Sequence, residues 1–191
     1  MTTIAPLRDF VVAMTALADA GAGEARFLTE GKALLASLIG RDDWLPEAFA
    51  APGPTYRQYL LHCDAAERFS VVSFVWGPGQ RTPIHDHLTW GIIGMLRGAE
   101  ISISMTPDPT GGPVRAGRAD RLAEGEVVAV SPTLGDVHVV ENALADRPSI
   151  SIHVYGGNIG RISRHVFDAA TSAPKPFISG YLNDVVPNLW V

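Results

Sequence analysis

Hydrophobic residues in the first fifty positions recur at helical spacing. Apolar side chains three and four positions apart predict one amphipathic helix near the N-terminus and a second helix after two glycines. The first stripe is Leu7, Phe10, Val11, Met14 and Leu17, and the second is Phe27, Leu28, Leu34, Leu35, Leu38 and Ile39. A proline-rich joint at 51–55 ends this part. We therefore expect residues 1–50 to form a helical N-terminal region.

From about residue 56 the pattern changes to short β-rich runs that glycine and proline separate. The runs are YRQYLLHC, RFSVVSFVW, TWGIIGMLRG, AEISISM, EVVAVSP, DVHVVENA, SISIHVYGG and RISRHVFD. Strands do not alternate with helices, so a parallel sheet is not expected. The pattern predicts a mainly β (α+β) fold in one domain over 1–191. An antiparallel barrel would span 56–170, with a helical cap before it and a C-terminal extension over 171–191.

Composition narrows the class of protein. The chain of 191 residues carries 20 Asp+Glu against 15 Lys+Arg, a net charge of −5, which argues against nucleic-acid or anionic-membrane binding. No apolar run approaches the roughly 18–20 residues that span a bilayer. The stretch FVVAMTALADA resembles a signal peptide, but Asp9 cancels the charge of Arg8, which favours a helix. The single cysteine excludes an internal disulfide and fits a reducing, cytoplasmic location. No feature indicates an oligomeric state.

Three histidines are spaced like metal ligands. His85 and His87 are two residues apart, so on an extended strand both imidazoles would project from the same face. His138 follows a tight turn before a later strand. One H-x-H pair alone is common in cores and on surfaces, but clustered histidines with this spacing indicate a metal site. Imidazoles suit several metals, so the metal does not follow from the ligand type.

The run PSISIHVYGG has alternating apolar and polar residues. Ile150, Ile152 and Val154 would face one way, and Ser149, Ser151, His153 and Tyr155 the other. A polar outer face is one interpretation, because apolar faces normally meet the core. If the barrel lumen holds the site, the polar row lies inside. There a hydroxyl, an imidazole and a phenol could form a relay that moves protons and orients a substrate.

The spacing of these motifs resembles the two sequence motifs of the cupin superfamily. The first surrounds His85 between Gly79 and Gly98, and the second surrounds His138 between Gly125 and Asn142. The first motif usually has a glutamate ligand where this chain has Gly91, and the second usually has one residue fewer between its proline and glycine. The resemblance implies a cupin, or jelly-roll, barrel. Three neutral ligands would leave the metal charge uncompensated and favour an anionic ligand such as a thiolate.

The chain also resembles, nearly end to end, the thiol dioxygenases, iron-dependent cupins that convert a thiol to a sulfinate with O2. The shared segments are DDWLPE, QYLLH, RFSVVSFVWGPGQ, TPIHDH, WGIIGMLRG, GDVH, SISIHVYG, NIG and KPFISGY. The resemblance is closest to the bacterial 3-mercaptopropionate dioxygenases. It implies that His85, His87 and His138 bind Fe(II). It also implies that Ser151, His153 and Tyr155 form the relay beside the iron.

Three positions distinguish the subfamilies. Mammalian-type cysteine dioxygenases bind the substrate carboxylate with an arginine where this chain has Gln58, and they carry a cysteine, cross-linked to the relay tyrosine, where it has Gly91. The bacterial enzymes that this chain resembles supply a later arginine, which matches Arg164. The resemblance therefore implies that Arg164, helped by Gln58, binds the carboxylate of 3-mercaptopropionate, because a guanidinium binds carboxylates bidentately. Without the resemblance, Arg164 would be an ordinary surface arginine.

The sequence also allows other functions. An L-cysteine dioxygenase is an alternative with the same chemistry. A non-enzymatic metal-binding cupin and a zinc-dependent hydrolase or isomerase are alternatives of other classes. We expect a small thiol carboxylate and O2 as the partners, with no nucleic acid and no membrane. Cys63 is expected to be buried and inert, His62 and His165 to be structural or exposed, and Trp90 to line a pocket or the core.

Overall fold

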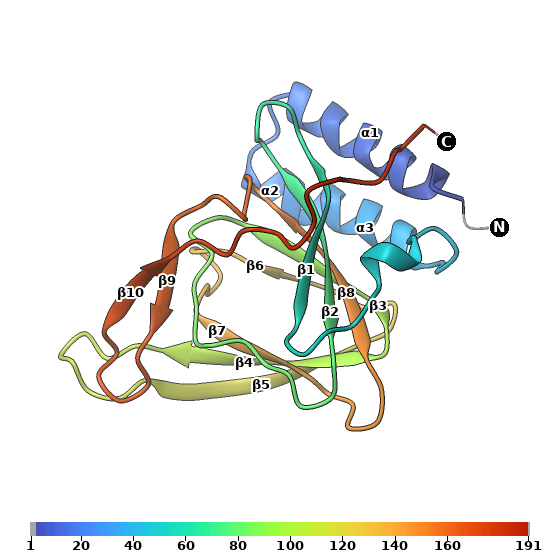
Figure 1. The fold of residues 1–191 in the computed structure, drawn as a ribbon. Helices are drawn as coiled ribbons and strands as arrows, with labels where there is room; N and C mark the ends of the chain where they lie inside the picture. The colour runs from blue at the N-terminus through green and yellow to red at the C-terminus, as the bar shows by residue number, and fades with distance from the viewer. Residues whose placement is uncertain (1–2, 191) are drawn as a thin grey trace.

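The computed structural model describes residues 3–190, and its helices gather at the N-terminal end (Figure 1). Helix α1 spans Ala5–Asp19, and the short α2 (Glu24–Arg26) continues through a π-helical turn (Phe27–Gly31) into α3 (Lys32–Ile39). All five residues of the first predicted stripe are buried in α1. A 3₁₀ turn, Glu47–Phe49, follows. The predicted helical region is confirmed for the described residues; residues 1–2 and 191 lie outside them.

Ten strands in the described chain form three antiparallel sheets. The five-stranded sheet has the order β1 (Arg57–Cys63), β2 (Ser70–Trp76), β8 (Ser149–Tyr155), β3 (Gly91–Arg97) and β6 (Val127–Val130). The three-stranded sheet has the order β5 (Arg115–Ala123), β4 (Ala99–Thr106) and β7 (His138–Asn142), and β9 (Arg164–Phe167) pairs with β10 (Pro174–Phe177). The prediction of a mainly β, antiparallel fold is confirmed.

Two strands were not predicted from the sequence pattern. Each of the eight predicted runs contains a strand, whereas β5 and β10 were not expected. Strand β5 lies at the edge of its sheet and is exposed along most of its length, so it shows no alternation of apolar and polar residues. Strand β10 contains two prolines, which are tolerated because it also lies at an edge.

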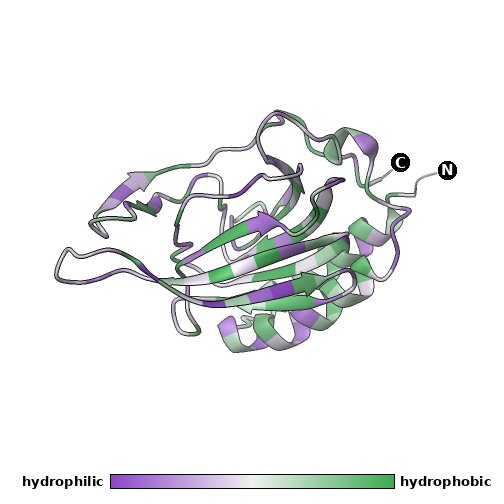
Figure 2. Cartoon of the chain, turned by 90° about the horizontal axis from the view of Figure 1, so that it is seen from below, coloured by the Kyte–Doolittle hydropathy of each residue, from purple (hydrophilic) through white to green (hydrophobic). Residues whose placement is uncertain are grey.

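The main core lies between the helices and one face of the five-stranded sheet. Side chains of α1 and α3 pack there against Ile92, Ile152 and Val154. The helices sit close to the sheet: a Cβ atom on Gly94 of β3 would lie 2.9 Å from Cδ1 of Ile39. Figure 2 shows the corresponding bands of hydrophobic and hydrophilic residues along the strands, with the helices against one face.

The other face of the five-stranded sheet looks toward the three-stranded sheet and encloses the lumen. A second apolar cluster lies here and includes Phe74, Trp76, Val140 and Tyr155. The apolar residues of β8 belong to the core under the helices, so its polar residues project into the lumen. The interpretation of this polar row as an outer face is therefore wrong.

The segment after β10 covers the free edge of β1 (Figure 1, red). The Leu182 N–H donates to the carbonyl of Gln58 at 2.9 Å. The Asn183 side chain accepts from the Leu60 N–H at 2.8 Å and donates to the Leu60 carbonyl at 2.9 Å. This segment thus bonds the edge groups of β1 in place of a further strand.

No helix within residues 3–190 is long and apolar enough to cross a membrane.

Candidate metal centre

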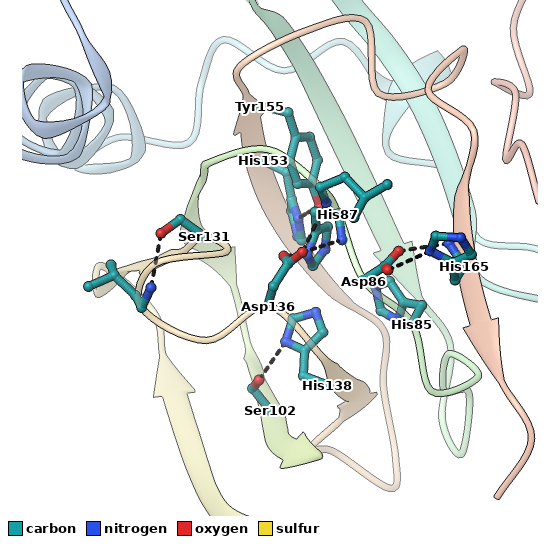
Figure 3. A network of polar contacts seen from close by, with 12 residues as sticks. His85, Asp86, His87, Ser102, Ser131, Asp136, His138, His153, Tyr155 and His165 are labelled. Atoms are coloured by element: carbon teal, nitrogen blue, oxygen red, sulfur yellow. Dashed lines mark hydrogen bonds and ion pairs between the residues drawn. The ribbon is translucent and has the colours of Figure 1, made fainter. Parts of the chain in front are cut away.

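The three predicted histidine ligands converge in the lumen (Figure 3). His85 and His138 form an antiparallel bridge in which each N–H donates to the other's carbonyl at 3.1 Å. The donor atoms of His85, His87 and His138 all lie within 4.8 Å of one another, and all three residues are buried. The structure therefore brings together side chains of the type, number and spacing that can hold a metal ion.

The backbone around His85 and His87 differs from the expected strand. Residues 77–90 form an irregular segment between β2 and β3, in which His85 makes only isolated bridges, to His138 and Val166. Leu88, directly after His87, has a positive φ of 58°, a conformation that is rare outside glycine. The two imidazoles converge because hydrogen bonds to distant parts of the chain, such as those to His138 and Asp136, determine the conformation of this segment. The expectation of a regular strand is wrong.

The outer nitrogen of each histidine is already hydrogen bonded. Nδ1 of His85 lies 3.0 Å from the carbonyl oxygen of Pro83, Nδ1 of His87 lies 2.9 Å from the Asp136 carboxylate, and Nδ1 of His138 lies 3.0 Å from the Ser102 hydroxyl. These contacts leave Nε2 of each ring free to donate its lone pair to a metal ion. Such outer partners fix the tautomer and orientation of metal-binding histidines, so the residues present fit a bound metal.

Burial keeps two of these imidazoles neutral. It lowers the pKa of His85 to about 3, with the neighbouring His87 adding to the effect. Burial likewise lowers the pKa of His138 well below its usual value, and the other two histidines contribute. A metal needs the neutral, lone-pair form of imidazole, and these environments supply it across the physiological pH range.

Asp136 organises the ligand His87. Its carboxylate accepts hydrogen bonds from the His87 N–H at 3.0 Å, from Nδ1 of His87 at 2.9 Å and from the Leu88 N–H at 2.9 Å. Burial alone would raise the pKa of Asp136, but the bonds from His87 and Leu88 outweigh it and the pKa falls. The residue belongs to the GDVH segment, whose aspartate had no assigned role in the sequence-based prediction.

The polar residues of β8 form a continuous chain, the Ser–His–Tyr relay (Ser151, His153 and Tyr155). The Ser151 hydroxyl lies 2.8 Å from Nε2 of His153, and Nδ1 of His153 lies 2.8 Å from the Tyr155 hydroxyl. Burial lowers the pKa of His153 and raises that of Tyr155, so both are neutral. The Tyr155 ring stacks beside His87, with ring centroids 5.3 Å apart. One end of the relay therefore lies at the histidine cluster.

Arg164 is buried without a carboxylate partner. Its side chain is 4% exposed, and one terminal nitrogen donates to the Ser179 hydroxyl at 2.8 Å. Its Nε has no partner within the described residues, and the guanidinium lies 4.5 Å from the centre of the Phe177 ring. None of the ion pairs within residues 3–190 includes it. The interpretation as a surface arginine is wrong, and burial lowers the pKa of this guanidinium.

Gln58 and Arg164 both donate a hydrogen bond to the Ser179 hydroxyl. Its side-chain NH₂ donates to the Ser179 hydroxyl at 3.1 Å and to the Gly180 carbonyl at 2.9 Å. Both amide protons are thus engaged, which leaves the amide oxygen, an acceptor. Direct contact between Gln58 and a substrate carboxylate stays a prediction. The observed contacts indicate that Gln58 positions the 179–180 segment beside Arg164.

Comparisons with known proteins agree with this geometry. A family model described as cysteine dioxygenase type I matches residues 49–168, well over half of the chain. The chain belongs to the cysteine dioxygenase type I family. Among solved structures, it resembles a protein from Thermus thermophilus with a TM-score of 0.46 at 18% identity, covering 58% of this chain and 92% of that one.

Two further structures of similar fold carry cupin descriptions. A cupin superfamily protein from Desulfitobacterium hafniense has a TM-score of 0.44 at 12% identity, covering 62% of this chain and 94% of that one. An RmlC-like cupin family protein with a double-stranded β-helix fold, from Methanocaldococcus jannaschii, has a TM-score of 0.43 at 14% identity, covering 58% of this chain and 88% of that one. The strand pairing and the packed helices of this member of the cysteine dioxygenase type I family agree with the predicted antiparallel barrel and its N-terminal helices.

Gly91 lies directly against the Tyr155 ring. The two residues pair across β3 and β8, and a Cβ atom on Gly91 would lie 2.9 Å from the Tyr155 ring. Position 91 therefore faces the ring that a cysteine there would reach. Cys63, the single cysteine, pairs with Ser70 on β2, and Ser70 pairs in turn with Tyr155. The thiol is thus two strands away from the tyrosine.

The remaining candidates have structural roles. The Asp86 carboxylate accepts from the His165 N–H at 2.7 Å and lies 2.8 Å from its Nδ1, which joins the ligand segment to β9 (Figure 3). Trp90 stacks on Phe27 at 4.5 Å in the core under the helices, so it is a core residue and not a pocket wall. Cys63 is only half-buried, contrary to expectation, although burial still raises the pKa of its thiol.

Proposed function

We propose that this protein is an Fe(II)-dependent thiol dioxygenase that oxidises 3-mercaptopropionate with O2 to 3-sulfinopropionate. The observation that supports this substrate class is the buried, carboxylate-free guanidinium of Arg164. A buried charge without a partner is costly, and a substrate carboxylate would compensate it with two parallel hydrogen bonds. Family membership supports the dioxygenase chemistry.

His85, His87 and His138 would hold the iron through their Nε2 atoms. When bound, iron supplies the O2 chemistry, and the protein supplies binding, orientation and electrostatics. The three histidines carry no negative charge, so a thiol binds there best after it has lost its proton. The Tyr155 hydroxyl, at the end of the relay beside His87, is placed to hold or accept that proton.

Aromatic side chains form part of the lumen wall beside His153. Phe74 packs against His153 with ring centroids 4.3 Å apart, and Trp76 packs on Phe74 at 5.5 Å. Charge interactions at the site are strengthened when water is excluded. Arg164 fixes one end of a short thiol acid and the histidines fix the other, so the chain length of the substrate is selected by their separation.

L-Cysteine is the alternative substrate within the same chemistry. Cysteine adds an ammonium group, which needs an acceptor or a carboxylate near the site. The carboxylate whose charge acts on Arg164 is Asp86, and it is already bonded to the N–H and Nδ1 of His165. This favours the thiol acid without an amino group. Comparing kcat/KM for the two thiols separates these possibilities.

The central experiment is anaerobic iron reconstitution followed by O2 uptake and product analysis with 3-mercaptopropionate. Sulfinate formed with matching O2 consumption is the expected result. A protein that binds iron and the thiol but forms no sulfinate would contradict the proposal and favour a non-enzymatic cupin. Metal analysis of protein purified without added iron tests the zinc-dependent alternative.

Arg164→Ala tests the carboxylate contact. Charge-assisted hydrogen bonds contribute about 1.5–3 kcal/mol, so KM for 3-mercaptopropionate should rise roughly 10- to 150-fold at unchanged metal content. A thiol without a carboxylate should show no such difference between the variant and the native protein. The exposed Arg161→Ala is the matched control. An unchanged KM in Arg164→Ala would contradict the assignment of Arg164 as the residue that binds the substrate carboxylate.

A further inference from the structure

Glu100 is a buried carboxyl group whose charge is not compensated by the residues around it. It lies on β4, is 2% exposed, and its Oε2 has no hydrogen-bond partner among the described residues. It takes part in none of the ion pairs within residues 3–190. Buried polar groups are nearly always hydrogen bonded, and an isolated buried charge is costly. This carboxyl group therefore needs an explanation.

The residues opposite Glu100 on the two neighbouring strands offer it no hydrogen bond. Leu122 lies opposite it on β5, and Asn142 lies opposite it on β7. The leucine side chain is apolar. The side-chain NH₂ of Asn142 donates to the carbonyls of Trp76 and Arg147, both at 3.0 Å, so both of its protons are already used.

Glu100 lines a cavity of about 830 Å³ between β4 and β6, here called the β4–β6 cavity. Along β4 the residues become more exposed from Glu100, which is buried, to Ser104, which is exposed, and both line this cavity. Four residues of a strand span about 13 Å. Leu134, 65% exposed, also lines the cavity. The carboxyl group therefore lies at the inner end of a cavity that opens toward solvent.

The other carboxylates of the β4–β6 cavity already have partners. Asp136 is bonded at the metal centre, as described above. Asp120 forms an ion pair with Nε of Arg118 at 2.5 Å. Glu126 accepts a hydrogen bond from the Ala123 N–H at 2.7 Å. Glu100 differs from these three residues because its negative charge has no such partner within the part of the chain that the structure describes.

Two nitrogen-containing side chains line the same cavity, and neither compensates Glu100. Arg121 pairs with Ile101 on β4, so its side chain projects from the opposite face of the sheet to that of Glu100. Burial lowers the pKa of His138 well below its usual value, so this imidazole is neutral. Its Nδ1 lies 3.0 Å from the Ser102 hydroxyl, which also lines the cavity (Figure 3).

The walls between Glu100 and the opening are mainly apolar. The apolar residues that line the β4–β6 cavity include Met105, Leu122, Val127, Val128, Val130 and Leu134. A ligand that suits this cavity has a cationic head for the carboxylate and an apolar body for the walls. An ammonium group is a compact donor of three hydrogen bonds, and its bonds to a carboxylate are charge-assisted.

We propose that the β4–β6 cavity binds a primary amine with a short, unbranched apolar body, and that its ammonium group donates to the Glu100 carboxylate. Among the described residues, those that line the cavity include neither Arg164 nor Tyr155. The amine site is therefore separate from the proposed thiol-acid site and does not depend on the proposed activity. Burial raises the pKa of Glu100 to about 7, so the carboxylate is ionised at pH 8.

Calorimetric titration with n-pentylamine at pH 8 tests this site in protein loaded with Zn(II). Glu100→Gln removes the charge at almost the same size and should weaken binding roughly 10- to 150-fold. Glu126→Gln is the matched control and should bind like the native protein, because Glu126 lines the same cavity but is exposed. From methylamine to n-pentylamine the affinity should rise about 2- to 4-fold for each CH₂ group. The neutral n-pentanol should bind at least about tenfold more weakly than n-pentylamine.

NMR shifts of backbone amides locate the bound amine, since Zn(II) is diamagnetic. We expect n-pentylamine to shift the amide signals of Ser102 and Leu122 and to leave those of Arg164 and Gly180 unchanged. Addition of 3-mercaptopropionate should not displace the amine. Displacement by the thiol acid, or shifts at Arg164, would place the amine at the other site and overturn the inference.

The remaining outcomes test the two parts of the ligand. Equal binding of n-pentanol, or native affinity in Glu100→Gln, would show an apolar cavity in which Glu100 has no role. Equal binding of ammonium chloride would show a site for simple cations and contradict the apolar body. Should Glu100→Gln not fold, the comparison of n-pentylamine with n-pentanol and the map of amide shifts still decide. Sulfinate formation by the iron-loaded protein tests the dioxygenase separately from all of these results.

Discussion

Asp136 holds His87 and the strained residue after it through one carboxylate, so its replacement by asparagine is informative. Oδ1 lies at Nδ1 of His87, and Oδ2 accepts from the backbone N–H groups of His87 and Leu88. An asparagine has a single acceptor oxygen. If that oxygen faces the backbone, its NH₂ faces Nδ1 and forces the His87 proton onto Nε2, the atom that must bind metal. If it faces Nδ1, the NH₂ opposes two N–H donors.

Either orientation weakens the metal site. Loss of an outer partner typically lowers metal affinity about 10- to 100-fold, which corresponds to about 1.4–2.8 kcal/mol. We expect Asp136→Asn to raise the Kd for Fe(II) or Zn(II) by this factor, measured by titration against a competing chelator. Asp146→Asn, which removes an exposed carboxylate, should leave the Kd unchanged. A folded Asp136→Asn with native metal affinity would refute the argument that Asp136 fixes the His87 tautomer.

Two further predictions concern packing and pH. Gly91→Ala would place a methyl group 2.9 Å from the Tyr155 ring, so we expect a loss of about 1–3 kcal/mol in the free energy of unfolding and a displaced tyrosine; a native melting temperature would contradict this. The hydrogen bond from Arg68 lowers the pKa of Asp64 from 3.8 to about 2. Asp64→Asn should therefore cost about 1–2 kcal/mol above pH ~4, and the difference from the native protein should shrink as pH falls toward 2. Urea unfolding between these pH values measures it, and a constant difference would refute it.

The sequence was sufficient for the parts of the fold that bury one face. The stripe in α1 and the alternation in β8 follow directly from the need to cover a core, and both are as predicted. Strand β5 could not be predicted in this way, because an exposed edge strand has no buried face to leave a pattern. The irregular segment around His85 depends on partners far away in the chain, which no local pattern encodes.

The site divides along the same line. The three histidines and the relay residues were predictable because their spacing within short motifs determines which side chains share a face. Ser179 was missed, since it is a loop residue. Its contact with Arg164 arises from tertiary packing. Gly91 is different, because the sequence itself shows that no side chain is present where the backbone comes close to the Tyr155 ring.

Residues 179–183, which cover the edge of β1, are synthesised long after β1 itself. Gln58 and Leu60 are bonded to residues 121–123 positions later in the chain. At about 5–20 residues per second, a ribosome needs roughly 6–25 s to make that stretch. Until residues 179–183 have been made, the edge of β1 keeps unpaired N–H and C=O groups, to which another strand can pair. The contacts that close this edge are therefore among the last that the chain can form.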